Sequence, residues 1–234
     1  MYIEKIDFPN GIPISYEAWQ IGSYHLHTHK DVIEILLVIK GKAKVTISFE
    51  TFEMNEGDYV VIRESDSHTF SATYSGCEIV SLYFRMEDYL NKIPYLYYVI
   101  FGCESFDLAK YRNETSKIRK MIISIILNLI KADEKSMKEA EKGAKDLLWL
   151  LVNDYDMIKY YNRKWDVPFS KIEKYYKIMS YIFDYYYIKN IQEYISQKEY
   201  YSKSYITHFF KEVGASSFKD LLAYVRLFKS EEML

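Results

Sequence analysis

The segment HLHTHKDVIEILLVIKG, residues 25–41, places three histidines at alternate positions and a carboxylate, Glu34, a few residues later. Alternate residues of a β-strand point to the same face, so His25, His27 and His29 would share one face of an extended segment. Imidazole nitrogens and a carboxylate suit Zn(II), Ni(II), Fe(II) or Mn(II). The same side chains would also line a pocket for an anion or a sugar. The spacing predicts a metal site, a small-molecule pocket or the remnant of either.

A second group of polar side chains lies near the C-terminus, in a predicted helix–turn–helix arrangement. One helix ends near Glu199, Ser202 is placed to cap the next helix, and Gly214 stands where a glycine would end it. Its buried stripe is predicted to comprise Ile206, Phe209, Phe210 and Val213, and a further helix from about Ser217 would bury Phe218, Leu221, Leu222 and Val225.

The outer face of the second helix would carry small polar and basic residues: Lys203, Ser204, Thr207, His208 and Lys211. Side chains of these types hydrogen-bond base edges and phosphates in a DNA major groove. An ordinary helical hairpin with a solvated face fits the same pattern. This face is therefore a candidate DNA-binding surface.

The histidines lie in a region, extending to about Phe84, that is predicted to form strands. In KAKVTISFE the apolar residues alternate with polar ones, which is typical of a half-buried strand: Ala43, Val45, Ile47 and Phe49. Turn segments such as IKGK and NEGD separate further short runs rich in β-branched and aromatic residues. Several short strands at this spacing predict a sandwich or a barrel.

Two amphipathic helices are predicted next, over about 114–131 and 137–151. Their apolar residues recur with helical spacing: Ile118, Met121, Ile122, Ile125, Ile126 and Leu129, then Met137, Ala140, Ala144, Leu147, Leu148 and Leu151. The short polar break between them favours an antiparallel pair. Both stripes are interpreted as core or as a dimer interface. Pro168 interrupts the pattern, so we expect domains at 1–85, 86–165 and 166–234.

The overall composition limits the classes of function. The chain has 234 residues, 49% of them hydrophobic, and a formal net charge of -2. This charge excludes a global attraction to nucleic acid or anionic membranes, so a DNA-binding surface must be local. Cys77 and Cys103 give neither metal-ligand spacing nor a disulfide framework, and the N-terminus lacks an apolar signal core. We expect a cytoplasmic protein.

The segment YSKSYITHFFKEVGASSFKDLLAYVRLFKSEEML, residues 201–234, resembles the signature of the AraC/XylS family of bacterial transcription regulators. The matching positions are Tyr201, Ser202, Phe210, Lys211, Gly214, Ser217, Phe218, Tyr224, Arg226, Leu227, Ser230, Met233 and Leu234. In that family the helix after the serine is the recognition helix of the first of two helix-turn-helix units. The resemblance implies base contacts by Ser204, Thr207 and His208. It also implies phosphate contacts by Lys203 and Lys211.

The chain departs from that family's pattern in two places. Tyr200 stands where the family usually has a glycine, and a positive φ there would cost a bulky residue about 1 kcal/mol or more. The resemblance ends at Leu234, so we expect only the first helix-turn-helix and the start of the linker helix in this chain. A single unit would make few phosphate contacts and bind DNA weakly and with strong salt dependence.

The N-terminal region resembles a cupin, the usual sensor domain in that family. The first cupin motif, His-x-His, three or four residues, Glu, six residues, Gly, matches at His27, His29, Glu34 and Gly41. The second places a histidine eleven residues after a glycine, as His68 follows Gly57, while the motif's Pro, second Gly and Asn are replaced by Arg63, Ser65 and Ala72. The resemblance implies that four residues recognise an effector, directly or as ligands of a divalent metal: His27, His29, Glu34 and His68. His25 would lie at the barrel mouth or outside it.

Together these patterns predict an α+β protein in which a cupin-like β-barrel precedes antiparallel helices and a helix-turn-helix segment. The expected function is that of a homodimeric transcription regulator, without enzymatic activity, that senses a small-molecule effector and binds promoter DNA. Dimerisation would use the helices between Glu114 and Val152. A metal-dependent cupin enzyme is one alternative, and a dimerising modulator that does not bind DNA is another.

Overall fold

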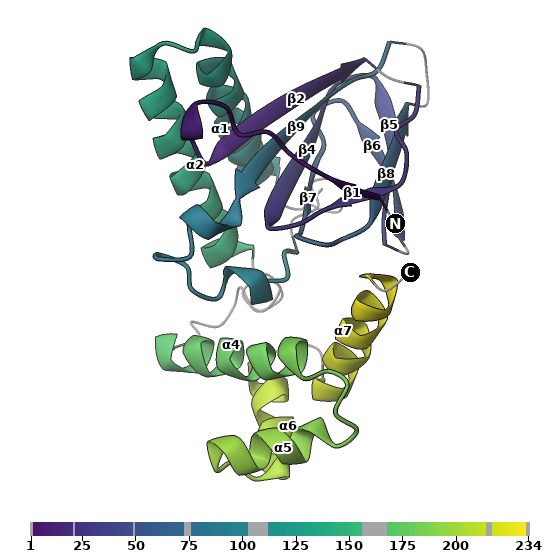
Figure 1. The fold of residues 1–234 in the computed structure, drawn as a ribbon, viewed down its shortest axis with the longest axis vertical. Helices are drawn as coiled ribbons and strands as arrows, with labels where there is room; N and C mark the ends of the chain where they lie inside the picture. Colours follow the sequence, from purple (N-terminus) through teal and green to yellow (C-terminus); the bar gives the residue numbers. More distant parts are fainter. Residues whose placement is uncertain are drawn as a thin grey trace. The chain divides into compact units, whose positions relative to one another are not determined.

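The computed structural model describes residues 2–20, 22–48, 50–72, 76–102, 112–155, 168–213 and 217–232. The chain divides into two compact units, one comprising Met1–Pro94 and Cys103–Leu151, the other Tyr95–Gly102 and Val152–Leu234 (Figure 1). The helical pair that follows the strands thus belongs to the same unit as the strands. The boundary predicted near residue 165 lies outside the described residues.

The first unit is built on a β-sandwich, and with the helices that follow it the predicted α+β class is confirmed. In the described residues one sheet contains, in spatial order, β1 (Tyr2–Glu4), β3 (His27–His29), β8 (His68–Ala72), β5 (Lys42–Ile47) and β6 (Glu50–Asn55). The other contains β2 (Ile14–Gln20), β9 (Glu78–Arg85), β4 (Val32–Lys40) and β7 (Tyr59–Ile62). Short 3-10 helices follow β1 and β9: η1 (Pro9–Gly11) and η2 (Met86–Asp88).

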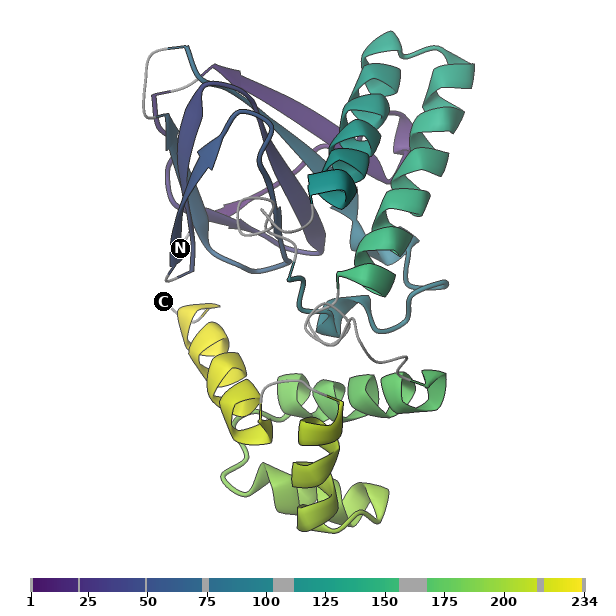
Figure 2. The same ribbon diagram turned by 180° about the vertical axis from the view of Figure 1, so that it is seen from behind.

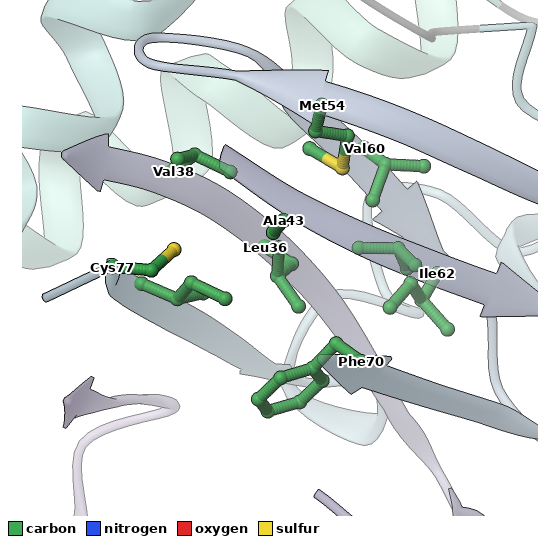
Figure 3. Packing of buried hydrophobic residues seen from close by; sticks show 10 residues of the cluster. Leu36, Val38, Ala43, Met54, Val60, Ile62, Phe70 and Cys77 are labelled. Carbon is green, nitrogen blue, oxygen red and sulfur yellow. The ribbon is translucent and has the colours of Figure 1, made fainter. Parts of the chain in front are cut away.

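An apolar cluster fills one part of the sandwich interior (Figure 3). Both sheets contribute to it: Leu36, Val38, Val60, Ile62 and Ile79 from one, and Ala43, Val45, Met54 and Phe70 from the other, with Cys77 just before β9. The predicted inward positions Ala43 and Val45 are buried and Ile47 is half-buried, whereas Phe49 lies outside the described residues. The period-2 pattern therefore identified the inner face of β5 correctly.

Strand β4 is buried on both faces, which explains its nearly continuous apolar sequence. Glu34, Leu36 and Val38 share the interior face. Ile33 and Ile35 share the opposite face with Leu37. Helices α1 (Arg112–Lys131) and α2 (Glu134–Asp154) cover that outer side of the sheet (Figures 1 and 2).

The predicted apolar stripes of these two helices are buried within the first unit: Ile118, Ile122, Ile125, Ile126 and Leu129 on α1, and Ala140, Ala144, Leu147, Leu148 and Leu151 on α2. Met121 and Met137 are half-buried. The two apolar stripes are therefore part of the core, as one of the two interpretations predicted. Their buried side chains are not free to form a dimer interface. No described helix is both long enough and apolar enough to cross a membrane.

The second unit contains η3 (Leu96–Tyr98), α4 (Phe169–Asp184), α5 (Ile191–Glu199), α6 (Lys203–Glu212) and α7 (Phe218–Glu232). Aromatic rings join three of these helices, because Phe210 of α6 lies 5.8 Å from Tyr175 of α4 and 5.6 Å from Phe218 of α7 between ring centroids. The predicted stripe of α6, Ile206, Phe209, Phe210 and Val213, is buried. On α7 Leu221 and Val225 are buried, whereas Leu222 is only half-buried.

A three-residue turn, Tyr200 to Ser202, connects α5 to α6. The Ser202 side chain accepts a hydrogen bond from the Tyr205 amide at 3.0 Å, so the predicted N-cap is confirmed. Tyr200 ends α5 in the left-handed region with φ 56° and ψ 33°, although its side chain is 95% exposed and contributes little packing. Tyr200 therefore adopts a backbone conformation that favours glycine. The steric strain expected of a bulky residue with a positive φ is present.

Replacing Tyr200 with glycine is expected to stabilise the α5–α6 turn by about 1 kcal/mol, because glycine adopts a positive φ without the Cβ clash. Hydrogen–deuterium exchange of α5 and α6 peptides should slow accordingly. Tyr200→Ala is the matched control, since it removes the same exposed ring but keeps Cβ, and its exchange should resemble that of wild type. Equal slowing in both variants would contradict backbone strain as the cause.

Candidate metal centre

Four buried side chains from the two sheets meet inside the sandwich. His27 and His29 extend from β3, and His68 of β8 lies directly opposite His27 in the antiparallel β3–β8 pair. Glu34 extends from β4 in the facing sheet. One nitrogen or oxygen atom from each residue lies within 4.8 Å of the others, and each residue is at most 1% exposed. The structure therefore brings together all four residues proposed from the sequence.

Strand alternation places this cluster next to the apolar one. Glu34 and Leu36 point inward from β4, as His68 and Phe70 do from β8. Each of these strands therefore contributes one polar ligand and then apolar side chains to the same interior. The cluster is consequently enclosed by protein on the side of the apolar core.

The Glu34 carboxylate lies at the centre of the contacts. Its Oε2 atom is 3.0 Å from His29 Nε2 and 2.9 Å from His68 Nε2. Its Oε1 atom accepts a hydrogen bond from the Ser81 hydroxyl at 2.5 Å. The carboxylate is thus held by one oxygen and faces two imidazoles with the other.

Backbone carbonyls orient two of the imidazoles. His27 Nδ1 lies 2.9 Å from the carbonyl oxygen of His25, and His68 Nδ1 lies 3.0 Å from that of Asp66. A carbonyl only accepts hydrogen bonds, so each Nδ1 carries a proton and directs Nε2 toward the cluster. This outer-shell arrangement is typical of metal-ligating histidines.

The ionisation of the cluster follows from burial and from the Glu34–His68 contact. Burial lowers the pKa of His27 to about 4, and the neighbouring His68 adds to the effect, so His27 is neutral at neutral pH. Burial alone would raise the pKa of Glu34, but His68 and His29 outweigh it and hold that pKa well below its usual range. Burial alone would lower the pKa of His68, but the Glu34 carboxylate raises it.

This donor set fits a divalent transition-metal ion. Three imidazoles and one carboxylate are ligands that Zn(II), Ni(II), Fe(II) and Mn(II) accept. His68 Nε2 is buried and makes no aligned hydrogen bond, even though it lies close to Glu34 Oε2. An ion between the two residues would satisfy both atoms. His27, His29, Glu34 and His68 are the residues that would hold it.

Two turns within the second cupin motif keep backbone conformations that favour glycine. Gly57 has φ 82°, and a Cβ there would lie 2.6 Å from Arg119 Cζ. Ser65, at a position where the cupin motif has glycine, has φ 64°. The same turn contains a buried ion pair, with Arg63 Nε 3.3 Å from Asp66 Oδ2. The residues of this motif have changed, but the turn still presents the Asp66 carbonyl to His68.

The remaining predicted residues lie elsewhere. His25 is exposed, as expected for a residue outside the cluster; its carbonyl oxygen contacts His27 Nδ1, and its ring lies 5.7 Å from the His27 ring between centroids. The five candidate DNA-binding residues, Lys203, Ser204, Thr207, His208 and Lys211, are all exposed on α6.

Sequence reasoning missed several polar residues near the cluster. Glu4 of β1 lies 3.4 Å from His27, measured between Oε2 and Nε2. Glu17 of β2 accepts a hydrogen bond from the Tyr83 hydroxyl at 3.2 Å, and burial raises the pKa of its carboxyl, as does the charge of Glu4. The YIE and ISYEAWQ segments alternate as strands do, but alternation does not specify their partners.

A comparison with family models identifies a cupin domain in this region. Residues 18–83 match the family model of the cupin domain. Among solved structures the chain is similar to the cupin domain of Cnp3 from Schizosaccharomyces pombe, at 12% identity and a TM-score of 0.32 over 37% of this chain and 66% of that one. KdgF from a Halomonas species has 16% identity and a TM-score of 0.28, over 31% of this chain and 79% of that one.

A third similar structure is oxalate decarboxylase from Bacillus subtilis, at 22% identity and a TM-score of 0.29 over 33% of this chain and 22% of that one. This chain thus spans less than two thirds of the length of the Schizosaccharomyces pombe and Bacillus subtilis structures. The comparison with curated proteins gave no match.

The fold and the site define a β-sandwich that encloses a cluster of three histidines and one glutamate, of the kind that binds metal ions. With the family match, this region is an N-terminal cupin domain, and a helical region follows it. The cupin part of the predicted resemblance is confirmed. The AraC part receives no support from the comparisons and stays a prediction.

Protein purified without chelator or affinity metal is expected to contain close to one divalent ion per chain, measured by inductively coupled plasma mass spectrometry. A His27→Ala/His68→Ala double variant should lose this ion, because two of the four ligands are gone. His25→Ala removes a nearby imidazole outside the cluster and should keep the metal. A folded wild type that binds none of Zn(II), Ni(II), Fe(II) or Mn(II) on titration would contradict the metal site.

Proposed function

We propose that this protein is an effector-sensing transcription regulator of the AraC type. Its cupin domain would bind a small molecule, and its helical unit would bind promoter DNA through α5 and α6. The observation that carries the proposal is the α5–α6 pair, in which α6 is capped by Ser202, buried along one face and polar or basic along the other. Its presence in one chain with an enclosed ligand cluster favours a sensor over an isolated binding module.

The sensing site of this proposal is the His27, His29, Glu34 and His68 cluster. An effector would contact these residues directly or through a divalent metal ion, which would supply a Lewis-acidic centre for anionic or hydroxyl groups. The cluster is buried, so an effector would be desolvated on binding and recognised by its hydrogen-bonding groups. Effector binding regulates DNA binding only if the effector favours one arrangement of the two units over another.

The DNA-facing surface of this proposal is the exposed side of α6. Gln192 of α5 donates hydrogen bonds to the Lys203 carbonyl and to the Thr207 hydroxyl, both at 2.9 Å, and so fixes the first turn of α6. Lys203 pairs with Glu193 at 2.9 Å, an exposed contact that a DNA phosphate could replace at little cost. The N-terminal residues of such a helix are those that reach base edges in known helix-turn-helix proteins.

A metal-dependent enzyme is the second candidate function. The observation that favours it is the polar surrounding of the cluster, where Glu4, Glu17 and Tyr83 lie near the four candidate ligands. A dioxygenase, isomerase or lyase would need such groups for proton transfer. Metal-dependent turnover that is lost in His68→Ala would favour the enzyme over the regulator.

Homodimerisation through α1 and α2 is also proposed, on a face that the core leaves uncovered. Ile123, Leu127 and Ile130 of α1 are 37%, 52% and 56% exposed and recur at i, i+4 and i+7, so they form one row. A second copy of the chain would cover this row. If the protein forms this dimer but does not bind DNA, the function that remains is the alternative of a dimerising modulator.

DNA binding can be tested by selecting duplexes from a random pool with the full chain and measuring affinity for the enriched sequence. His208→Ala should weaken that affinity by about 5- to 150-fold without changing binding to random DNA, because one good base contact is worth about 1–3 kcal/mol. Lys211→Ala should weaken binding to the enriched sequence and to random DNA. It should also reduce the number of counterions released on binding, measured from the salt dependence of the affinity, by about one. Lys145→Ala, on exposed α2 surface, should change neither. Failure to enrich any sequence would contradict base recognition.

Dimerisation can be tested by sedimentation equilibrium of Leu127→Glu. The charge would have to be desolvated within an apolar interface, so the dimer dissociation constant should rise at least about tenfold. Ser124→Glu adds the same charge at a neighbouring exposed position of α1 outside the row, and should leave the constant nearly unchanged. A monomeric wild type, or equal effects of both substitutions, would exclude this row as the interface.

A further inference from the structure

Glu4 lies at the edge of the cluster formed by His27, His29, Glu34 and His68 because of an unusual pairing in the first sheet. Strand β1 pairs in parallel with β3, with Tyr2 opposite His27 and Glu4 opposite His29. Residues at matched positions of paired strands face the same side of the sheet. The Glu4 side chain therefore enters the interior beside His29, and it is only 13% exposed.

One carboxylate oxygen of Glu4 faces the histidines without a hydrogen-bond partner. Its Oε2 atom lies 3.4 Å from His27 Nε2 and 3.9 Å from His29 Nε2, and it is buried. Neighbouring ligand atoms on one ion lie roughly 3–3.5 Å apart when each metal–ligand bond is about 2.1 Å. Glu4 Oε2 thus lies about as far from His27 Nε2 as a neighbouring ligand atom would, and slightly farther from His29 Nε2.

The other oxygen of Glu4 is held in place. The Tyr24 hydroxyl donates a short hydrogen bond to Glu4 Oε1. The Tyr24 ring is itself fixed, because it stacks on Phe70 at a centroid distance of 5.2 Å and meets His27 edge-on at 4.9 Å. Hydrogen bonds of this kind orient the carboxylates that bind metals. Glu4 therefore resembles Glu34, whose outer oxygen is held by Ser81 and whose inner oxygen faces imidazoles.

We propose that Glu4 is a fifth protein ligand of the ion held by His27, His29, Glu34 and His68. This inference rests on the metal-binding form of the proposed site. Two carboxylates would balance the charge of one divalent ion. Three nitrogen and two oxygen donors exceed the four positions of a tetrahedral ion, so the site would prefer Mn(II), Fe(II), Co(II) or Ni(II) to Zn(II).

The proposal assigns a role to β1 that its length does not suggest. A strand of three residues, paired only with β3 in the described sheet, is held by few backbone hydrogen bonds. Ligation of Glu4 would attach β1 to the opposite sheet through the ion and Glu34. Metal binding should then slow hydrogen exchange in the peptide that contains β1, and this slowing should require the Glu4 carboxylate.

The test is a Co(II) titration of the full chain, followed by absorption spectroscopy and by hydrogen exchange of the β1 peptide. Glu4→Gln is expected to weaken Co(II) binding by about tenfold or more, to intensify the visible bands as the coordination number falls, and to abolish the metal-dependent protection of β1. Glu17→Gln is the matched control, because it removes the same charge from the same interior, where Glu17 is bonded to Tyr83. It should weaken Co(II) affinity less than Glu4→Gln does and leave the spectrum unchanged, because Glu17 would act on the ion only through its charge.

Equal losses of affinity in Glu4→Gln and Glu17→Gln, with unchanged spectra, would overturn the proposal, because Glu4 would then act only through its charge. A spectrum and an exchange pattern that respond only to Glu4→Gln would support it. A wild type that binds neither Co(II) nor Mn(II) would overturn the metal site itself and Glu4 ligation with it. The His27→Ala/His68→Ala variant distinguishes these failures, since it should lose metal whether or not Glu4 is a ligand.

Discussion

The cupin domain is organised around a fully buried carboxylate. Moving the Glu34 charge out of water costs on the order of several kcal/mol unless partners replace the water. Here Ser81 holds one oxygen and two imidazoles face the other, which requires strands from both sheets to meet in one register. Because β4 and β8 also carry the apolar core beyond the cluster, the register that satisfies Glu34 is the same one that buries Leu36 and Phe70.

Local patterns in the sequence predicted much of this arrangement. Alternation identified the common face of His27 and His29, and the helical spacing identified the buried faces of α1 and α2. The part that could not be predicted depends on distant pairing. Glu4 reaches the cluster only because β1 joins β3 in parallel, and neither segment carries a signal that selects this partner. Charge and side-chain type alone also do not indicate that Glu4 contacts the histidines whereas Glu17 contacts Tyr83.

The helical unit illustrates the difference between a predicted fold and a predicted function. Ser202 and the α6 stripe were predicted from residue chemistry, because caps and stripes are local, whereas the left-handed turn at Tyr200 was expected only from the family resemblance. Arg226, part of the sequence resemblance, binds the carbonyl oxygens of Tyr186 and Ile188 and so fixes the loop between α4 and α5. That contact gives the residue a structural role, whereas DNA recognition depends on side chains whose partner is another molecule.

From Val32 to Val38, strand β4 has no free face, since Glu34 and Leu36 point into the sandwich while Ile33, Ile35 and Leu37 pack on the helix side. The backbone of β4 therefore lies between two close-packed regions, the sandwich interior and the layer under α1 and α2, and has little room to move. A ligand that displaces Glu34 cannot be accommodated by β4 alone, because the same peptide units hold the residues that support α1 and α2. Mechanical strain created at the cluster would reach the helix pair directly through main-chain atoms, without a relay of side-chain rearrangements.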